Sequence, residues 1–294
     1  MHGEHTCRGR TVINLCVTAD DYGLSRDING GIHSLVAHRA VSAVSVMVHR
    51  EARLDDVAAL RGRVATGLHL MLVGERPLLP DRLAPLLDAQ GFLPMRYWGL
   101  FMQLARDPRW MARLSDEIIA QLARYRTLGL PLHFVNSHQH VHLLPPIWRR
   151  VMRAAHQQGF PPLLRTAEGT VRGGIHQTLL SGASRLAARL HPAARRLSLQ
   201  AIGLGFAGRS TLQDIDDALA RVARTHSEGA PVIYELVVHP GFEHAPAAAR
   251  HLAWGIRWQR EHDLLLSPDF HAVLRRHAAV LIAPEQIAAA LGAS

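Results

Sequence analysis

Seven residues with metal-binding or acid–base side chains lie where apolar runs of the sequence end. They are Asp20, Asp21, His69, His138, His140, His142 and His239. A catalytic metal site needs about three protein ligands and open positions for water and substrate. A mixture of imidazole and carboxylate groups favours zinc, nickel, cobalt or iron over calcium, and it is also compatible with magnesium.

Taken one at a time, these motifs have simpler explanations. The Asp20–Asp21 pair could cap the helix that follows it, and a single histidine such as His69 can be an ordinary core residue. The run from His138 to His142 is more informative, because a strand that continued this far would place its three histidines on one face. Three neighbouring imidazoles repel one another when protonated, so a bound metal or anion best explains the cluster.

The elements that must position these residues follow an alternating pattern of short β-rich runs and longer helical runs. This pattern is typical of βα units around a parallel sheet. The predicted strands are Val12–Thr18, Ala43–Val48, Thr66–Leu70, His133–Ser137, Pro162–Arg165, Leu199–Ile202 and Val232–Val238. The predicted helices are Ile28–His38, Arg109–Leu128, Pro146–Gln158, Thr211–Thr225 and Ala247–Glu261, with Gly129 and Gly159 at positions typical of a helix C-terminus. About seven parallel strands predict an α/β barrel.

In an α/β barrel, active sites are assembled at the carboxyl ends of the strands. The Asp pair and the histidines all fall at such ends, so we expect them to form one centre. Two stretches interrupt the alternation, near 73–108 and 171–196, and long excursions of this kind are often functional loops. We therefore expect a flexible tail at 1–11 and one barrel domain at 12–294, with both excursions contacting the substrate.

The composition, 48% hydrophobic and 19% charged residues in 294, is that of a packed globular protein. The net charge of +9 comes from arginine alone, which is explained by compositional bias or by attraction to an anionic partner. Aromatic residues make up only 5% and no RNA- or DNA-binding motif is present, so we expect no nucleic-acid partner. No apolar run is long enough to span a membrane and the start lacks an apolar signal region, which predicts a cytoplasmic protein with Cys16 in its core.

Four runs in this sequence together resemble the YdjC/ChbG-like carbohydrate deacetylases, a family that shares a distorted (β/α) barrel with the NodB-type polysaccharide deacetylases. They are ADDYG at Ala19–Gly23, GLHL at Gly67–Leu70, HQHVHLLP at His138–Pro145 and HPG at His239–Gly241. The resemblance extends from about Val12 to Gly241. It implies a hydrolase that removes the N-acetyl group from an amino sugar.

The resemblance also implies a role for each residue. Asp21, His69 and His138 would bind one divalent ion, zinc or magnesium, with Asp20 as the general base and His239 as the general acid. That leaves His140 and His142 as residues that support the ligands or contact the substrate. Arg165 could orient Asp20 or form an ordinary ion pair at the rim. Asn136 is a departure, because relatives often carry Asp there in a D-[ST]-H-x-H-x-H run.

Within the family, the run Gly203–Thr211 and the arginine-rich segment Leu179–Leu199 resemble the branch associated with hopanoid biosynthesis, often called HpnK. This resemblance implies an amino sugar carried on a hopanoid lipid. The basic segment would then be either a surface helix or an interfacial segment at the cytoplasmic membrane face. The sequence leaves the oligomeric state open, a homodimer included.

Two other functional classes compete with this interpretation. An amidohydrolase-type barrel also uses an H-x-H motif, but places it on the first strand, where this chain has Asp20 and Asp21. A non-enzymatic metal-binding or membrane-adhering protein would explain the 20 histidines but not their shared location at strand ends.

Overall fold

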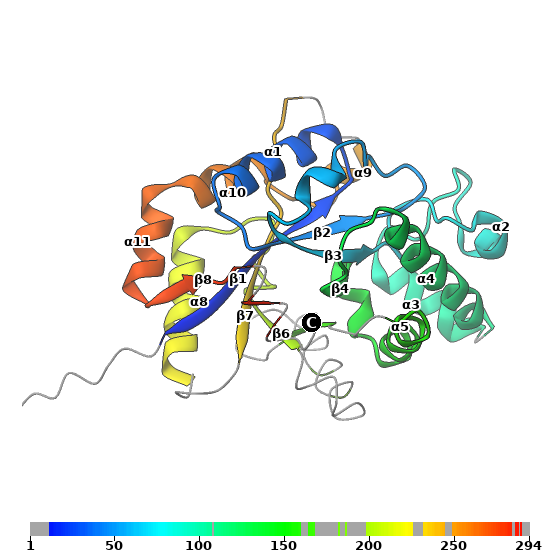
Figure 1. Ribbon diagram of the computed structural model, residues 1–294. Helices are drawn as coiled ribbons and strands as arrows, with labels where there is room; N and C mark the ends of the chain where they lie inside the picture. The colour runs from blue at the N-terminus through cyan, green and yellow to red at the C-terminus, as the bar shows by residue number, and fades with distance from the viewer. Residues whose placement is uncertain are drawn as a thin grey trace, which may run out of the picture.

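The architecture comes from a computed structural model, shown in Figure 1. It describes residues 12–107, 109–159, 164–167, 182, 186, 198–225, 232–244, 249–283, 286–287 and 289. The predicted tail at 1–11 lies outside these residues. So do residues 162–163 of the fifth predicted strand and nearly all of the excursion at 171–196, including the basic segment up to residue 197.

Eight parallel strands form the sheet. They are β1 (Ile13–Tyr22), β2 (Ala43–Met47), β3 (Ala65–Leu70), β4 (Phe134–Ser137), β5 (Leu164–Ala167), β6 (Ser198–Ile202), β7 (Ile233–Val238) and β8 (Ala279–Leu281). The order is β2-β3-β4-β5-β6-β7-β1-β8, and β1 also pairs with β2. Strands β1 to β7 therefore close into a ring, which confirms the predicted barrel of about seven parallel strands.

The eighth strand was not predicted. It pairs with the first residues of β1, from Ile13 to Leu15, whereas β2 pairs with β1 from Thr18 to Tyr22. Because β7 occupies the other edge of β1, β8 and β2 share one edge of that strand. The short β8 thus extends the sheet beside the first residues of β1, which β2 does not pair with.

Helices cover the outside of the barrel (Figure 1). The α-helices are α1 (Arg26–Ala37), α2 (Pro80–Leu83), α3 (Tyr97–Arg106), α4 (Trp110–Thr127), α5 (Pro145–Gln157), α8 (Leu212–Thr225), α9 (Ala249–Leu252), α10 (Trp258–Leu266) and α11 (Pro268–Arg276). Short 3-10 helices lie at η1 (Val57–Leu60), η2 (Ala84–Leu86) and η3 (His138–Leu143). Among the described residues, none of the helices is both long and apolar enough to cross a membrane.

The prediction of one helix over 247–261 was wrong. That region contains two helices, α9 and α10, separated by a turn in which Gly255 has φ of 71°. A left-handed residue of this kind ends a helix. Gly129 and Gly159 confirm their predicted role after α4 and α5, with φ of 63° and 75°.

The strands are apolar because both of their faces are buried in the protein. Every residue of β2, β3 and β7 is buried, as expected for parallel strands that are covered on both faces. Two glycines allow close contacts that position the site. A Cβ on Gly67 would lie 2.6 Å from the Phe134 ring of β4, and one on Gly31 of α1 would lie 2.5 Å from Gly241. Cys16 is buried in this core, as predicted.

Candidate active site

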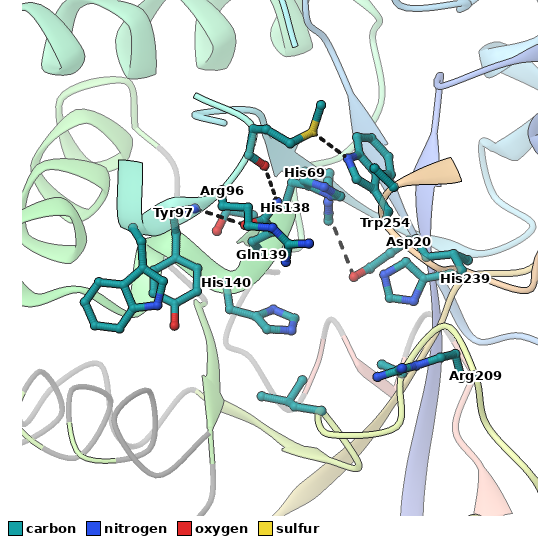
Figure 2. Close-up of a pocket in the computed structure, with 17 residues that line it drawn as sticks. Asp20, His69, Arg96, Tyr97, His138, Gln139, His140, Arg209, His239 and Trp254 are labelled. Carbon is teal, nitrogen blue, oxygen red and sulfur yellow. Dashed lines mark hydrogen bonds and ion pairs between the residues drawn. The ribbon is translucent and has the colours of Figure 1, made fainter. Parts of the chain in front are cut away.

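A cavity of about 440 Å³ opens at the carboxyl ends of the barrel strands. This volume falls within the usual range for small-molecule sites. Figure 2 shows the side chains of Asp20, His69, His138, His140 and His239 around it. Five of the seven residues singled out from the sequence therefore line one cavity. The excursion at 73–108 contributes further lining residues, namely Met95, Arg96, Tyr97 and Trp98.

A β-bulge brings two adjacent aspartates to one centre, Asp20 at the cavity lining and Asp21 beside His69 and His138. On β1, Ala19 pairs with Val44 and Tyr22 pairs with Val46, so β1 has one residue more than β2 between these pairs. Asp21 takes up the extra length with a left-handed φ of 70°. Such backbone is costly for a residue other than glycine and is often retained at functional sites. The bulge allows both carboxylates to serve the same centre, although adjacent strand residues normally face opposite sides.

Asp21, His69 and His138 converge as the sequence predicted. One ligand atom from each lies within 4.8 Å of the others, and all three residues are buried. The Asp21 Oδ1 atom is 3.3 Å from His69 Nε2 and 3.6 Å from His138 Nδ1. This spacing and donor set match a catalytic site with three protein ligands.

The polar atoms of this trio fit a metal ion because they have no other partner. Both oxygens of Asp21, the Nε2 of His69 and the Nε2 of His138 are buried without a hydrogen bond. Leaving such groups unsatisfied is costly, and a cation would satisfy them. Burial lowers the pKa of His69 to about 4, which keeps its imidazole neutral, as metal ligation requires. Burial alone would raise the pKa of Asp21, but contacts with His138 and His239 lower it to about 2.

His138, His140 and His142 would share one face only on a strand that continued past Ser137, and the strand does not continue that far. Strand β4 ends at Ser137, and residues 138–143 form η3, within which Gln139 and His140 have left-handed φ of 51° and 56°. The turn directs His138 to the metal trio and His140 into the cavity (Figure 2).

His142 lies beneath this turn. Its Nδ1 is 2.7 Å from Ser137 Oγ and its Nε2 is 3.0 Å from the Arg165 carbonyl oxygen. Burial lowers the pKa of His142 to about 3. It is therefore a neutral residue that joins β4 to β5, outside the cavity lining.

Asp20 is held by a buried network of hydrogen bonds. Its Oδ1 accepts from Ser45 Oγ at 2.6 Å, Asn136 Nδ2 at 3.1 Å and Arg165 Nη2 at 2.9 Å. Its Oδ2 accepts from Arg165 Nη1 at 2.6 Å. Burial alone would raise the pKa of Asp20, but the Arg165 guanidinium holds it well below the usual range.

Arg165 is fully buried, so it is no ordinary ion pair at the rim. Besides Asp20, it donates to both oxygens of Glu235 on β7, at 2.8 and 2.9 Å. Side chains of β2, β4 and β5 thereby hold the Asp20 carboxylate directly, and Glu235 of β7 holds it through Arg165. Glu235 was not identified as a site residue from the sequence, because its role depends on a contact with β5 that no local pattern reveals.

His239 follows β7 and faces the cavity beside Asp20 (Figure 2). Its backbone N–H donates to Glu261 Oε2 at 2.5 Å, and its Nδ1 is buried without a partner. Glu261 on α10 also accepts from Ser210. This glutamate was missed in the sequence, where it occurs within an ordinary amphipathic pattern.

Trp254 forms the wall of the cavity over the metal trio. Its ring lies 4.1 Å from that of His138, and its Nε1 donates to Met95 Sδ at 3.3 Å. The turn after β6 contributes Leu204, Ala207 and Arg209 to the lining. The cavity therefore combines a polar centre with apolar and aromatic walls.

Comparisons with known proteins are consistent with this geometry. The sequence model of a family described as YdjC-like protein matches residues 14–276. A carbohydrate deacetylase of Mus musculus is 29% identical over 299 residues, which cover 94% of this chain and 95% of the relative. A chitooligosaccharide deacetylase of Serratia marcescens is 29% identical over 231 residues, covering 78% and 81%.

A solved structure from Enterococcus faecalis, described as a cellobiose-phosphate cleavage protein, has the same fold. It aligns with a TM-score of 0.67 at 18% identity and covers 94% of this chain and 99% of its own.

Proposed function

Because the chain belongs to the YdjC-like protein family, we propose that it is a metal-dependent hydrolase that removes the N-acetyl group from an N-acetylated amino sugar. The observation that carries this proposal is the convergence of Asp21, His69 and His138, whose buried polar atoms lack partners, beside the anchored carboxylate of Asp20. The relatives named as carbohydrate and chitooligosaccharide deacetylases support the substrate class.

Asp21, His69 and His138 would hold the ion. An amide is a poor electrophile, and a divalent ion in this position supplies Lewis acidity, which polarises the carbonyl and can lower the pKa of water from about 15.7 to about 7. The protein's own part is to provide two imidazoles, a carboxylate and a cavity that admits the acetamido group.

Asp20 would take a proton from the attacking water. Its Oδ1 already accepts three hydrogen bonds, whereas Oδ2 accepts one, so Oδ2 has the capacity to receive the proton. The low pKa keeps the carboxylate ionised at neutral pH. It also makes Asp20 a weak base, so the water that it serves must be strongly acidified.

His239 would deliver a proton to the departing nitrogen. General acids of this kind contribute about 10²–10⁴-fold to a rate. His239 lines the cavity beside Asp20 (Figure 2), and the hydrogen bond from its backbone N–H to Glu261 holds its backbone in place. Acetate and a free amine would be the products.

We further propose that the sugar is carried on a hopanoid lipid. The run Gly203–Thr211, on which the resemblance to the hopanoid branch rests, supplies Leu204, Ala207 and Arg209 to the cavity wall. Residues from this run would therefore contact the substrate, which supports a role for them in its selection.

The experiment is mass spectrometry of products after incubating the metal-loaded protein with N-acetylglucosaminyl hopanoid lipid and, separately, with chitobiose. The proposal predicts loss of one acetyl group from the lipid-linked sugar and faster turnover of it than of chitobiose. Turnover of chitobiose alone would reject the lipid assignment but keep the deacetylase. No acetyl loss from either substrate, with metal bound, would reject the function.

A further inference from the structure

Asn136 contacts both halves of the proposed catalytic centre. It lies on β4 directly opposite His69 of β3 in the parallel register, and it is fully buried. Its Oδ1 is 2.8 Å from His69 Nδ1, and its Nδ2 donates to Asp20 Oδ1 at 3.1 Å. One side chain therefore joins a metal ligand to the proposed base.

The two contacts determine the orientation of the Asn136 amide and the tautomer of His69. Because the amide nitrogen donates to a carboxylate, the amide oxygen faces His69 and acts as an acceptor. His69 must then carry its proton on Nδ1, which leaves the Nε2 lone pair facing Asp21 at 3.3 Å. That nitrogen has no other hydrogen-bond partner, as a metal ligand requires.

An amide is well suited to this position because it offers an acceptor and a donor at the same time. Ser45 Oγ also lies 3.0 Å from His69 Nδ1, but it gives its single proton to Asp20. A carboxylate at position 136 would still accept from His69, yet it would place an oxygen against Asp20 where the amide places an N–H.

We infer that Asn136 is a positioning residue that fixes His69 and Asp20 in one arrangement, so that metal binding and base orientation are coupled. The inference rests on the proposed function for the role of Asp20. Residues that support metal ligands in this manner typically affect metal affinity or activity about 10–100-fold.

Two variants separate the contacts. Asn136→Leu removes both, so zinc affinity, measured by competition with a chromophoric chelator, should weaken about 10–100-fold and activity should fall with it. Asn136→Asp retains the oxygen that faces His69, so its zinc affinity should stay within about threefold of wild type while kcat falls about 10-fold or more. The absorption spectrum of the cobalt-substituted protein should change in the Leu variant and remain unchanged in the Asp variant.

Asn29 provides a matched control. It is also a buried asparagine with two contacts, since its Oδ1 accepts from Gly23 N at 2.7 Å and its Nδ2 donates to the Arg53 carbonyl at 2.8 Å. Asn29→Asp introduces the same chemical change outside the centre. It should lower the unfolding temperature while zinc affinity and kcat remain at wild-type values.

Three outcomes would overturn the inference. They are wild-type zinc affinity in Asn136→Leu, wild-type kcat in Asn136→Asp, or equal losses in Asn29→Asp. Should the Leu variant fail to fold, the isosteric Asp variant still provides the test. Zinc affinity can be measured without any enzymatic turnover. If the protein deacetylates no sugar, the proposed function is refuted, but the zinc affinities of the variants still test whether Asn136 positions His69.

Discussion

Replacing Arg165 by Met should destabilise the protein severely and invert part of its pH dependence. Arg165, Asp20 and Glu235 are all fully buried, and the guanidinium makes four hydrogen bonds to the two carboxylates. Methionine roughly fills the volume of the arginine stem but leaves both carboxylates without their cation.

Removing one partner of a buried ion pair costs about 3–5 kcal/mol. Since two carboxylates lose their partner here, we expect a loss of about 5 kcal/mol at neutral pH. Native proteins are stable by only about 5–15 kcal/mol, so Arg165→Met should be close to unfolding. Adding Glu235→Gln removes one of the stranded charges, so the double variant should recover part of the loss.

The pH dependence provides an independent readout. In the wild type, Arg165 lowers the pKa of Asp20 below its ordinary value of 3.8, so this group stabilises the fold above that pH and its contribution is lost on acidification. In the variant, burial without a cation raises the pKa of Asp20. Its carboxyl group then stabilises the fold when protonated, and this contribution is lost as the pH rises.

The assay is urea unfolding followed by circular dichroism at pH 5 and pH 7. Compared with wild type, the Arg165→Met variant should lose less stability at pH 5 than at pH 7. A loss below about 1 kcal/mol at pH 7, the usual worth of an exposed pair, would refute the reasoning. So would a loss that grows on acidification.

Three further predictions concern the proposed metal ligand His138, the proposed base Asp20, and the buried histidines His69 and His142. His138→Ala should abolish both metal retention and activity, and full metal stoichiometry by elemental analysis would contradict the ligand assignment. Asp20→Asn should retain the metal but lose about 10²–10⁴-fold in rate. If Asp20→Asn instead loses the metal and Asp21→Asn retains it, then Asp20 is the metal ligand and Asp21 is the general base. The free energy of unfolding of the metal-free protein should fall as the pH drops from about 6.5 towards 4. The reason is that His69 and His142, with pKa values of about 4 and 3 in the folded protein, bind fewer protons in the folded state than in the unfolded state. Each histidine lowers the free energy of unfolding by up to about 1.4 kcal/mol per pH unit. A flat urea-unfolding profile over that range would show that these imidazoles are not buried in the neutral form.

Much of the barrel could be predicted from the sequence because its strands are short apolar runs, and those of β1, β3, β4 and β7 end at or beside an Asp or a His. The convergence of Asp21, His69 and His138 could also be predicted, because all three lie at or near the carboxyl ends of predicted strands. In a parallel barrel these ends meet at one rim, however long the segments that connect the strands are. By contrast, β8 has only three residues, and its pattern of one buried, one exposed and one partly buried residue carries no signal against its surroundings.

Backbone conformation explains why no strand continues through the histidines and why the single helix predicted over 247–261 was wrong. Histidines spaced by two look like a strand, but Gln139 and His140 adopt left-handed backbone and turn the chain within η3. The apolar periodicity across 247–261 looks like one helix, but α9 ends at Leu252 and α10 begins only at Trp258. Gly255 alone signalled the interruption.

Long-range contacts explain why Glu235 and Glu261 were missed. Glu235 lies 70 residues along the chain from Arg165, which itself lies 145 residues from Asp20. No spacing rule links such positions, so the network emerges only when β1, β5 and β7 are placed around the ring. The same holds for Glu261, which reaches His239 from the outer helix α10.

The most direct test of the central claim is a titration of the metal-free protein with zinc while acetate release from an N-acetylglucosaminyl substrate is followed. The account predicts activity that rises linearly and stops at one equivalent of metal, with no rise in Asp21→Asn or His138→Ala. Full activity in the metal-free protein, or a rise in the two ligand variants equal to that of wild type, would contradict it.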